Sequence, residues 1–244
     1  ICQADCLTDG RIEIGVGRGA FAYEFDRFNV PVEESKDRFN DSLALLEQLL
    51  TGQEVGWKSD WYDFDPIAIT PHPVQQPIPI WIAALSYPAI YHSVKRGYHI
   101  QTTPLRGGME TVRTQATAFN DAVRDADGAL DHMKFSMLRM LYVAKDKADA
   151  DEKVAMAYEN HRRFCNVYDT PGTVKHGAII PIDVEESIDD VRDALLIGTA
   201  SEIINKLGAY QDLKVMDLLL NMGFGASHAD VMGSLERFAR DVMP

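Results

Sequence analysis

The sequence is poor in cysteine and has no long apolar run. Only Cys2, Cys6 and Cys165 are present among 244 residues. An odd number of cysteines without a C-x-x-C pair gives neither a disulfide framework nor a zinc-binding spacing, so we expect free thiols in a reducing cytoplasm. No apolar segment reaches the roughly 18 residues of a membrane-spanning helix. The first residues also lack a signal-peptide pattern, and we therefore expect a cytoplasmic protein.

The sequence also lacks an excess of basic residues. Asp and Glu number 37 against 24 Lys and Arg, which gives a formal net charge of −13. Nucleic acids and anionic membranes both require a basic surface, so neither is an expected partner. A hydrophobic fraction of 46% and a charged fraction of 25% are instead typical of a soluble globular domain.

Signatures of hydrolases are absent too. None of the seven histidines belongs to a His-x-His pair, the arrangement that metal-dependent barrel hydrolases place on a strand. Ser86 does not lie in a G-x-S-x-G turn, which argues against a nucleophilic serine. We expect no metal site. His228, after the last predicted strand, is the one histidine that we expect near a functional rim, and a surface position is the alternative.

Strand-like and helix-like segments alternate along the chain. The strands are predicted at residues 12–16, 78–84, 99–103, 134–144 and 215–224. The helices are predicted at residues 32–50, 88–96, 108–125, 148–168, 187–195, 199–210 and 228–241, with an aromatic hairpin or loop at 57–64. Strands separated by helices pair in parallel and carry the helices on the outside of the sheet.

This alternation predicts an α/β fold of the TIM (β/α)₈ barrel type. Five strand–helix units are visible where a closed barrel needs eight, and residues 1–6 resemble the end of a helix. We therefore expect the first three or so units, about 90 residues, to be absent from this sequence. Residues 1–244 would then form a single, partial barrel domain. A complete five-stranded, doubly wound open sheet is the alternative.

The first candidate site is a strand that ends in a glycine-rich turn. Ile12, Ile14 and Val16 form its β-branched body. Glycines at positions 15, 17 and 19 remove side chains and allow a flat ligand or a phosphate to approach the backbone. Arg18 would direct a guanidinium, which binds phosphate in a bidentate fork, into a cleft. A buried strand with a surface arginine is the alternative.

Two further candidates follow other strands. Ser86 precedes a helix that has Pro88 in its first turn, so free N–H groups and the hydroxyl would form an anion site. Because the carboxyl ends of barrel strands share one face, Arg18 and Ser86 would bind one phosphate. Residues 221–225, with two glycines and Phe224, would line a ring-binding pocket. Plain helix capping and a simple turn are the respective alternatives.

Several motifs together resemble the bacterial luciferase-like flavin monooxygenase family. Residues 5–11 (DCLTDGR) and 15–19 (GVGRG) are similar to its L-D-x-L-S-x-G-R turn and to the strand that ends in G-x-x-R-G. Residues 77–86 are similar to its P-x-P-P-x-W strand, and 197–200 to a helix start with Gly-Thr. Residues 238–244 (FARDVMP) are close to its C-terminal phrase. The matches keep the family's order over nearly the whole chain.

The resemblance implies a TIM barrel enzyme that uses reduced FMN and O₂ to oxygenate a small organic substrate. It implies a separate flavin reductase as the source of the reduced FMN, and a homodimer or homotetramer. Arg18 and Ser86 would bind the flavin phosphate, and Arg38 would be a second phosphate arginine. The residues that would line the flavin are Gly17, Ala83, Ala84, Leu85 and Tyr87.

Two features depart from the family pattern. Leu85 replaces a glutamate of the light-emitting catalytic subunit, so light emission is not implied. The family's catalytic histidine falls in the N-terminal region absent here, so the catalytic residues stay unknown. The alternatives are an oxidoreductase that uses coenzyme F420, a flavin-binding barrel without catalysis, and a barrel hydrolase or isomerase.

Overall fold

The computed structural model describes residues 1–170, 172–213 and 217–243. The chain divides into two compact units, Ile1–Ala83 and Ala84–Pro244, and each is described by itself. That residues 1–244 form one partial barrel domain stays a prediction, as does the expectation of about three units in front of it.

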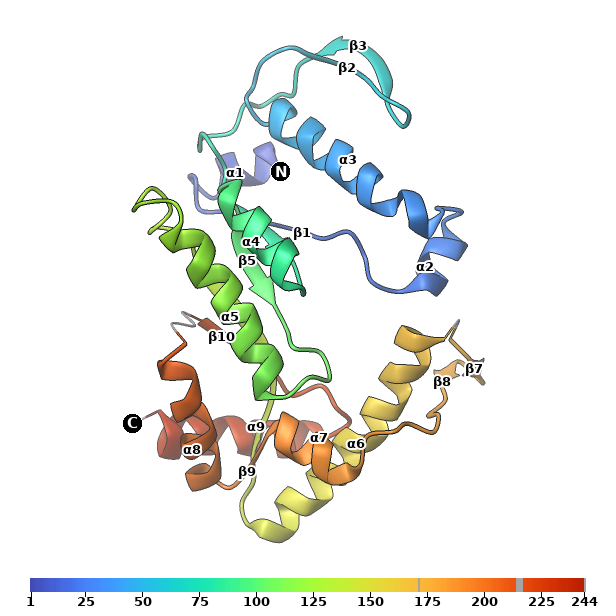
Figure 1. Ribbon diagram of the computed structural model, residues 1–244, viewed down its shortest axis with the longest axis vertical. Helices are drawn as coiled ribbons and strands as arrows, with labels where there is room; N and C mark the ends of the chain where they lie inside the picture. Colours follow the sequence, from blue (N-terminus) through green and yellow to red (C-terminus); the bar gives the residue numbers. More distant parts are fainter. Residues whose placement is uncertain (171, 214–216, 244) are drawn as a thin grey trace. The chain divides into compact units, whose positions relative to one another are not determined.

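The first unit contains two parallel strands, a long helix and a hairpin (Figure 1). Its elements are α1 (Cys2–Leu7), β1 (Ile14–Val16), α2 (Ala22–Arg27), the 3₁₀ helix η1 (Val32–Glu34), α3 (Ser35–Leu49), β2 (Val55–Lys58), β3 (Asp63–Ile67) and β4 (Ile80–Ala83). Strand β1 pairs in parallel with β4, with Val16 opposite Ile82. Strands β2 and β3 form the predicted hairpin, and Trp57 Nε1 in β2 donates to Asp41 Oδ1 of α3 at 3.1 Å.

A buried carboxylate joins α1 to the connector that leads into β4. Asp5 is fully buried, and its Oδ2 accepts hydrogen bonds from the N–H groups of Val74 and Gln75 at 2.7 and 2.9 Å. Gln75 Nε2 donates to Oδ1 at 2.8 Å. Burial alone would raise the pKa of Asp5, but these hydrogen bonds to its ionised form outweigh burial and lower the pKa. The charge is therefore fully satisfied inside the unit.

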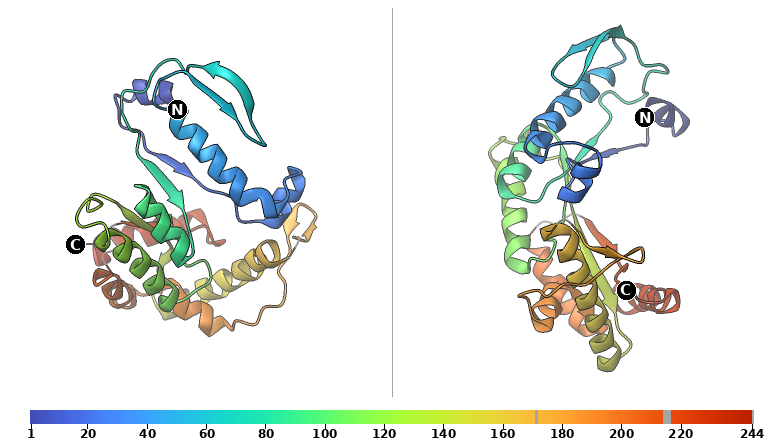
Figure 2. Two further views of the ribbon diagram at one scale, coloured as in Figure 1. Left: turned by 45° about the horizontal axis from the view of Figure 1, so that its top comes forward. Right: turned by 90° about the vertical axis from the view of Figure 1, so that its right-hand side faces the viewer.

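The second unit is built around one long strand, β6 (Phe135–Val143) (Figures 1 and 2). Its other elements are α4 (Tyr87–Lys95), β5 (His99–Thr102), α5 (Met109–Arg124), α6 (Lys147–Asp169), β7 (Val174–Lys175), β8 (Ala178–Ile179), α7 (Ile188–Ala194), β9 (Leu196–Gly198), α8 (Ala200–Gln211), β10 (Asp217–Asn221), α9 (His228–Arg237) and the π-helix η2 (Phe238–Val242). Strands β5, β9 and β10 all pair with β6 in parallel.

Strands β5 and β9 lie on the same edge of β6. The Lys134 carbonyl accepts from Ile100 N in β5, and Ala144 N donates to the Gly198 carbonyl in β9. Successive residues of a strand direct their backbone groups to opposite edges, and residues an even number apart direct them to the same edge. Residues 134 and 144 are ten apart. Strand β5 pairs with residues 135–137 and β9 with residues 141–143. Residues 138–140 therefore have no partner strand on this edge among the residues that the structure describes.

The core of this unit packs α5 against β6. Val112, Ala116 and Phe119 recur at helical spacing on α5, and all three are buried. Phe119 stacks on Phe135 of β6 with ring centroids 5.0 Å apart. Phe135 is itself fully buried, so the apolar face of α5 covers one face of the strand.

Most predicted elements are present within one or two residues of their expected ends. Strand β9 was not predicted, because only five residues separate α7 from α8 and residues 197–200 resembled a helix start. The acidic residues Glu24 and Asp26 lie in the short helix α2. Residues 215 and 216 of the last predicted strand, and residue 244 of the C-terminal phrase, lie outside the described residues.

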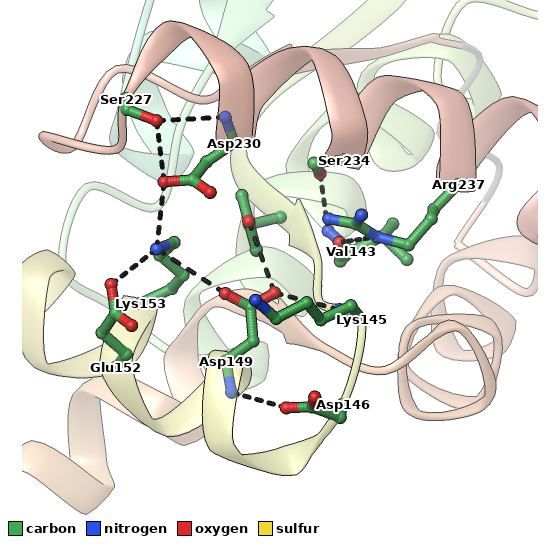
Figure 3. A network of polar contacts seen from close by, with 11 residues as sticks. Val143, Lys145, Asp146, Asp149, Glu152, Lys153, Ser227, Asp230, Ser234 and Arg237 are labelled. Atoms are coloured by element: carbon green, nitrogen blue, oxygen red, sulfur yellow. Dashed lines mark hydrogen bonds and ion pairs between the residues drawn. The ribbon is translucent and has the colours of Figure 1, made fainter.

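A buried charge network fixes the first half of α6 to α9 (Figure 3). The Lys153 ammonium, 3% exposed, lies 2.7 Å from Glu152, 3.2 Å from Asp230 and 3.6 Å from Asp149. Burial alone would lower the pKa of Lys153, but its hydrogen bonds to Glu152 and Asp230 outweigh burial and raise the pKa. Nearby, Ser234 Oγ of α9 accepts from Val143 N at 2.8 Å.

Candidate functional site

The glycine-rich end of β1 presents an exposed arginine. Arg18 Nη1 donates to Ser35 Oγ at 2.7 Å, and Ser35 Oγ donates in turn to the Val32 carbonyl at 2.5 Å. Ser35 is buried, whereas Arg18 is exposed. Within residues 1–83, no carboxylate lies at ion-pair distance from the guanidinium, so a neutral hydroxyl orients a cation whose charge is not compensated by an ion pair.

Two predicted flavin-lining residues lie together in the first unit. A Cβ added to Gly17 would lie 3.2 Å from the Cβ of Ala83, closer than most side-chain contacts. Gly15 has open space at the same position, with nothing within 4 Å. Glycine at 17 therefore allows the ends of β1 and β4 to approach each other, and the backbone there remains exposed.

Ser86 caps α4, as its sequence context predicts. Its hydroxyl accepts from Ala89 N at 3.4 Å, a long hydrogen bond that marks the first turn of the helix. The neighbouring Ala84 is buried, and its N–H donates to the Gln101 carbonyl at 3.2 Å. The Leu85 carbonyl accepts from Gln115 Nε2 at 2.9 Å. These contacts hold the β4–α4 turn in place.

The remaining predicted site residues are Tyr87, whose side chain has a partner, and Arg38, whose contact is through the backbone. Tyr87 donates its hydroxyl to Asp121 Oδ2 at 2.6 Å, and this hydrogen bond raises the pKa of Tyr87. Arg38, half-buried in α3, accepts through its carbonyl from Ser42 Oγ at 2.7 Å. Arg18 belongs to the first unit and Ser86 to the second, so their binding of one phosphate stays a prediction.

A cavity of about 200 Å³ opens in the second unit, beside the edge of β6 that has no partner strand. Eight of its fourteen lining residues are apolar: Leu105, Leu138, Met140, Ala157, Phe164, Val191, Ala194 and Leu195. The six polar ones are Thr103, Arg106, Arg139, Asn160, His161 and Asn221. Among these lining residues, all of which the structure describes, none is Asp or Glu.

Four polar groups meet beside this cavity: Arg106 and His161 line it, whereas Cys165 and Glu186 line a neighbouring pocket together with Arg106. His161 Nε2 lies 3.6 Å from Glu186 Oε2 and 3.6 Å from Cys165 Sγ. Arg106 Nε lies 3.9 Å from Glu186 Oε1, and Arg106 Nη1 lies 3.6 Å from Cys165 Sγ. These four distances are longer than those of strong hydrogen bonds, so the contacts among the four groups are individually weak. Sequence reasoning missed this cluster; the helical spacing of His161 and Cys165 was its one local signal.

A second arginine of the lining is buried in the wall. Arg139 is 4% exposed and donates through Nη2 to the Ala194 carbonyl. Its Nε has no hydrogen-bond partner among the described residues, and its guanidinium lies 6.0 Å from the centre of the Tyr210 ring. Burial lowers the pKa of Arg139 and raises the pKa of Tyr210.

The turn after β10 differs from the prediction in which of its residues lines a cavity. Asn221 lines the cavity, and its Oδ1 accepts from Gly223 N at 2.8 Å. Phe224, expected in a ring-binding pocket, is instead 3% exposed and packs edge-on against Tyr142 with ring centroids 5.9 Å apart. The prediction for Phe224 was wrong because an aromatic ring gains more by burial in the core. His228, the histidine expected near the rim, is exposed at the start of α9.

Two other features are absent from the described part of the chain. There, no group of three or more His, Cys, Asp or Glu side chains has the geometry to hold a metal ion. No described helix is both long and apolar enough to cross a membrane. The three cysteines are free thiols, with Cys2 and Cys165 buried and Cys6 exposed.

Comparison with curated proteins finds oxidoreductases that use flavin or F420. The chain is 27% identical over 252 residues to the oxygenase component of a flavin-dependent trigonelline monooxygenase from Acinetobacter baylyi. The match covers 99% of this chain and 69% of that protein. It is 24% identical to an F420-dependent glucose-6-phosphate dehydrogenase from Amycolatopsis mediterranei over 98% of this chain and 70% of the other. The chain spans 59% to 69% of the length of three of its curated relatives.

A solved structure and a family model give the same assignment as these curated relatives. Monooxygenase RslO1 from Streptomyces bottropensis superposes with a TM-score of 0.78 at 20% identity, covering 100% of this chain and 71% of that one. That similarity, together with the parallel strands and their helices, shows the α/β fold of the luciferase-like TIM barrel type. A model of the luciferase-like monooxygenases matches residues 1–216. The chain therefore belongs to the luciferase-like monooxygenase family.

Proposed function

We propose that this chain is the oxygenase of a two-component, flavin-dependent monooxygenase. It would receive reduced FMN from a separate flavin reductase and use O₂ to oxygenate a small organic substrate. The similarity to a trigonelline monooxygenase, itself described as an oxygenase component, supports this proposal. A cytoplasmic homodimer or homotetramer is part of the same proposal.

The observation that carries the proposal is the Arg18 guanidinium at the end of β1. It is exposed, it is oriented by the neutral hydroxyl of Ser35, and glycines at 15 and 17 leave the adjacent backbone open. A phosphate group of charge near −2 needs such a cation in a chain of net charge −13. These residues therefore fit the phosphate end and the flat ring of a flavin.

Each predicted residue has a distinct role in this proposal. Arg18 binds the phosphate in a bidentate fork, and Arg38 adds a second positive charge. Ser86 contributes N–H groups at the start of α4, where the helix dipole favours an anion. Gly17, Ala83, Ala84, Leu85 and Tyr87 line the ring. When bound and reduced, the flavin supplies the electrons that activate O₂, and the protein binds, orients and shields the reactants.

Coenzyme F420 is the alternative cofactor, because several relatives are F420-dependent dehydrogenases. Titrating the full chain with FMN and with F420, followed by absorbance and fluorescence, distinguishes the two. We expect saturable binding of FMN and weaker binding of F420. Tighter binding of F420 would replace the monooxygenase with a dehydrogenase, and binding of neither would contradict the proposal.

A second measurement separates an enzyme from a flavin-binding barrel without catalysis. The full chain is mixed with NADH, FMN and a flavin reductase, and consumption of NADH and O₂ is followed as candidate substrates are added. An oxygenase forms an oxygenated product from O₂ when its substrate is present. A flavin-binding barrel without catalysis gives only the background rate of the reductase.

A further inference from the structure

Gln115, on α5 in the second unit, is a buried amide that joins two turns of the backbone. The residue is 2% exposed. Its Nε2 donates to the Leu85 carbonyl at 2.9 Å and to the Thr103 carbonyl at 3.0 Å. Leu85 lies in the turn that leads into α4, and Thr103 follows β5 in the turn that leads into α5. One side chain therefore sets the positions of two backbone carbonyls.

These two hydrogen bonds determine how the amide of Gln115 is turned. Both acceptors are carbonyl oxygens, so the NH₂ end of the amide faces them. The opposite end, Oε1, is buried and has no hydrogen-bond partner among the described residues. A buried acceptor without a partner destabilises a fold, and an apolar side chain of similar volume would avoid that cost. Glutamine at this position is therefore explained by the two hydrogen bonds that it donates.

The first of these hydrogen bonds fixes the direction of a neighbouring N–H. The Leu85 carbonyl and the Ser86 N–H belong to one trans peptide plane, in which they point in opposite directions. Because Gln115 holds the carbonyl toward α5, the N–H points away from α5. Ser86 is exposed, and no described residue accepts a hydrogen bond from its N–H. This turn thus presents a donor of fixed direction to a ligand.

The second hydrogen bond anchors the amide and directs no donor. The residue after Thr103 is Pro104, which has no N–H. Pro104 is buried, and its carbonyl accepts from Gly107 N at 2.7 Å. Gln115 is held at its other end by α5, whose apolar face packs against β6. The amide is thus fixed from two sides, and the Leu85 carbonyl is the group that it positions.

We infer that Gln115 is a positioning residue of the flavin phosphate site. It holds the Leu85–Ser86 peptide so that the Ser86 N–H points to the phosphate, and it acts through this peptide instead of touching the flavin. A hydrogen bond to an anion is strong only when its donor is well aligned, and a peptide that is free to turn must be ordered when the ligand binds. The inference rests on the proposed function, in which Ser86 binds the phosphate.

Replacing Gln115 by an apolar side chain of similar size tests the inference. Gln115→Met removes both donated hydrogen bonds. We expect the dissociation constant of FMN to rise about tenfold and that of riboflavin, which has no phosphate, to rise less than about twofold. Fluorescence quenching of each flavin by the full chain at fixed salt measures both constants. An equal rise for the two flavins, or no rise for FMN, would overturn the inference.

Asn120→Leu is the matched control on the same helix. Asn120 Nδ2 also donates to a backbone carbonyl, that of Leu213 at 3.3 Å, but this contact lies outside the two turns that Gln115 joins. The control variant should bind FMN and riboflavin like the wild type. A loss of FMN binding equal to that of Gln115→Met would show a general loosening of α5 and reject the role of Gln115.

A second substitution keeps the test decisive where Gln115→Met does not fold, which thermal unfolding shows. In Gln115→Glu, a buried carboxyl group takes up a proton and donates one hydrogen bond in place of two. We expect it to weaken FMN about threefold, less than the methionine variant does. Wild-type binding of FMN by whichever variant folds would contradict the inference.

The amide resonance of Ser86 reports on the peptide itself. With 15N-labelled serine in the full chain, FMN should shift this resonance more than riboflavin does, because only FMN places an anion at the N–H. The difference between the two flavins should shrink in Gln115→Met. A difference as large in the variant as in the wild type would show that the Ser86 N–H needs no help from Gln115.

The outcomes separate this inference from the proposed function. A wild-type chain that binds neither FMN nor F420 loses the proposed function, and the role of Gln115 with it. A wild-type chain that binds FMN, together with a Gln115→Met variant that binds it equally well, keeps the proposed function and loses only the role of Gln115.

Discussion

The two halves of α6 carry charge clusters that are built in opposite ways. In the first half, Lys153 lies 2.7 and 3.2 Å from the carboxylates of Glu152 and Asp230 and is almost fully buried (Figure 3). In the second half, His161 lies 3.6 Å from Glu186, which lies 3.9 Å from Arg106, beside a cavity. Short, complete pairing leaves no group available for a ligand. The contacts of the second cluster are longer, and the cluster lies beside an open space.

The largest expected effect comes from breaking the first cluster. Lys153→Met leaves the buried carboxylate of Asp149 without its cation, and a broken buried pair costs about 3–5 kcal/mol. We expect about 3 kcal/mol in the free energy of unfolding, the lower end of that range, because Asp230 is partly exposed. Urea unfolding followed by circular dichroism measures it. Lys147→Met, exposed on the same helix, is the control and should change stability by less than about 0.5 kcal/mol.

Substitutions of Arg18, in the first unit, test whether a cation without an ion pair binds a ligand. We expect Arg18→Ala to weaken FMN binding by about 1.5–3 kcal/mol, the range for a hydrogen bond to a charged group. Arg18→Lys should recover only part of the loss, because an ammonium lacks the planar fork. Quenching of FMN fluorescence at fixed salt measures both. Riboflavin, which has no phosphate, is the control: an equal loss for riboflavin would refute the phosphate role.

Acid should weaken the first cluster in a predictable direction. Hydrogen bonds from Ser227 and Lys153 lower the pKa of Asp230 below its ordinary value of 3.8. A carboxyl group with a lowered pKa stabilises the fold above its ordinary pKa and loses that contribution as the pH falls through the lowered one. We therefore expect Asp230→Asn to be less stable than the wild type at pH 6, with a difference that shrinks between about pH 4 and pH 2. A difference that does not change with pH would show that the charge of Asp230 contributes nothing.

The smallest effect on stability is expected in the second cluster. His161→Gln removes two polar contacts of 3.6 Å and a ring stack on Tyr158 with centroids 6.5 Å apart, so the free energy of unfolding should change by less than about 1 kcal/mol. Thermal unfolding measures the change. A loss as large as that of Lys153→Met would mean that the cavity wall is a structural cluster, and the contrast between the two halves of α6 would fail.

Local signals explain what could be predicted from the sequence. Ser86, Ser187 and Thr199 each mark a helix start, because a cap acts through the N–H groups of its own first turn. The glycines around Arg18 mark a strand end in the same way, within a few residues. The β-branched and apolar runs likewise predicted β6 and two of the three strands that pair with it, β5 and β10.

The parts that could not be predicted depend on distant contacts. Arg106, His161 and Glu186 come from three separate segments, and no spacing in the sequence links them. The direction in which the Phe224 side chain points depends on Tyr142, which lies on β6. Strand β9 has three residues, and it is a strand only because the far end of β6 pairs with it. In each case the deciding partner lies tens of residues away in the chain.

The far end of β6 also has a consequence for how such a protein changes over generations. Strand β9 pairs only with the last three residues of β6, beyond the stretch that pairs with β5 and β10. Residues 158–195, which follow the part of α6 that is fixed to α9, therefore form a cassette that can be lengthened, shortened or exchanged without shifting the register of the main ladder. Six of the fourteen residues that line the cavity belong to this cassette. A library of variants with substitutions only in this cassette would change ligand preference and leave the rest of the fold unchanged.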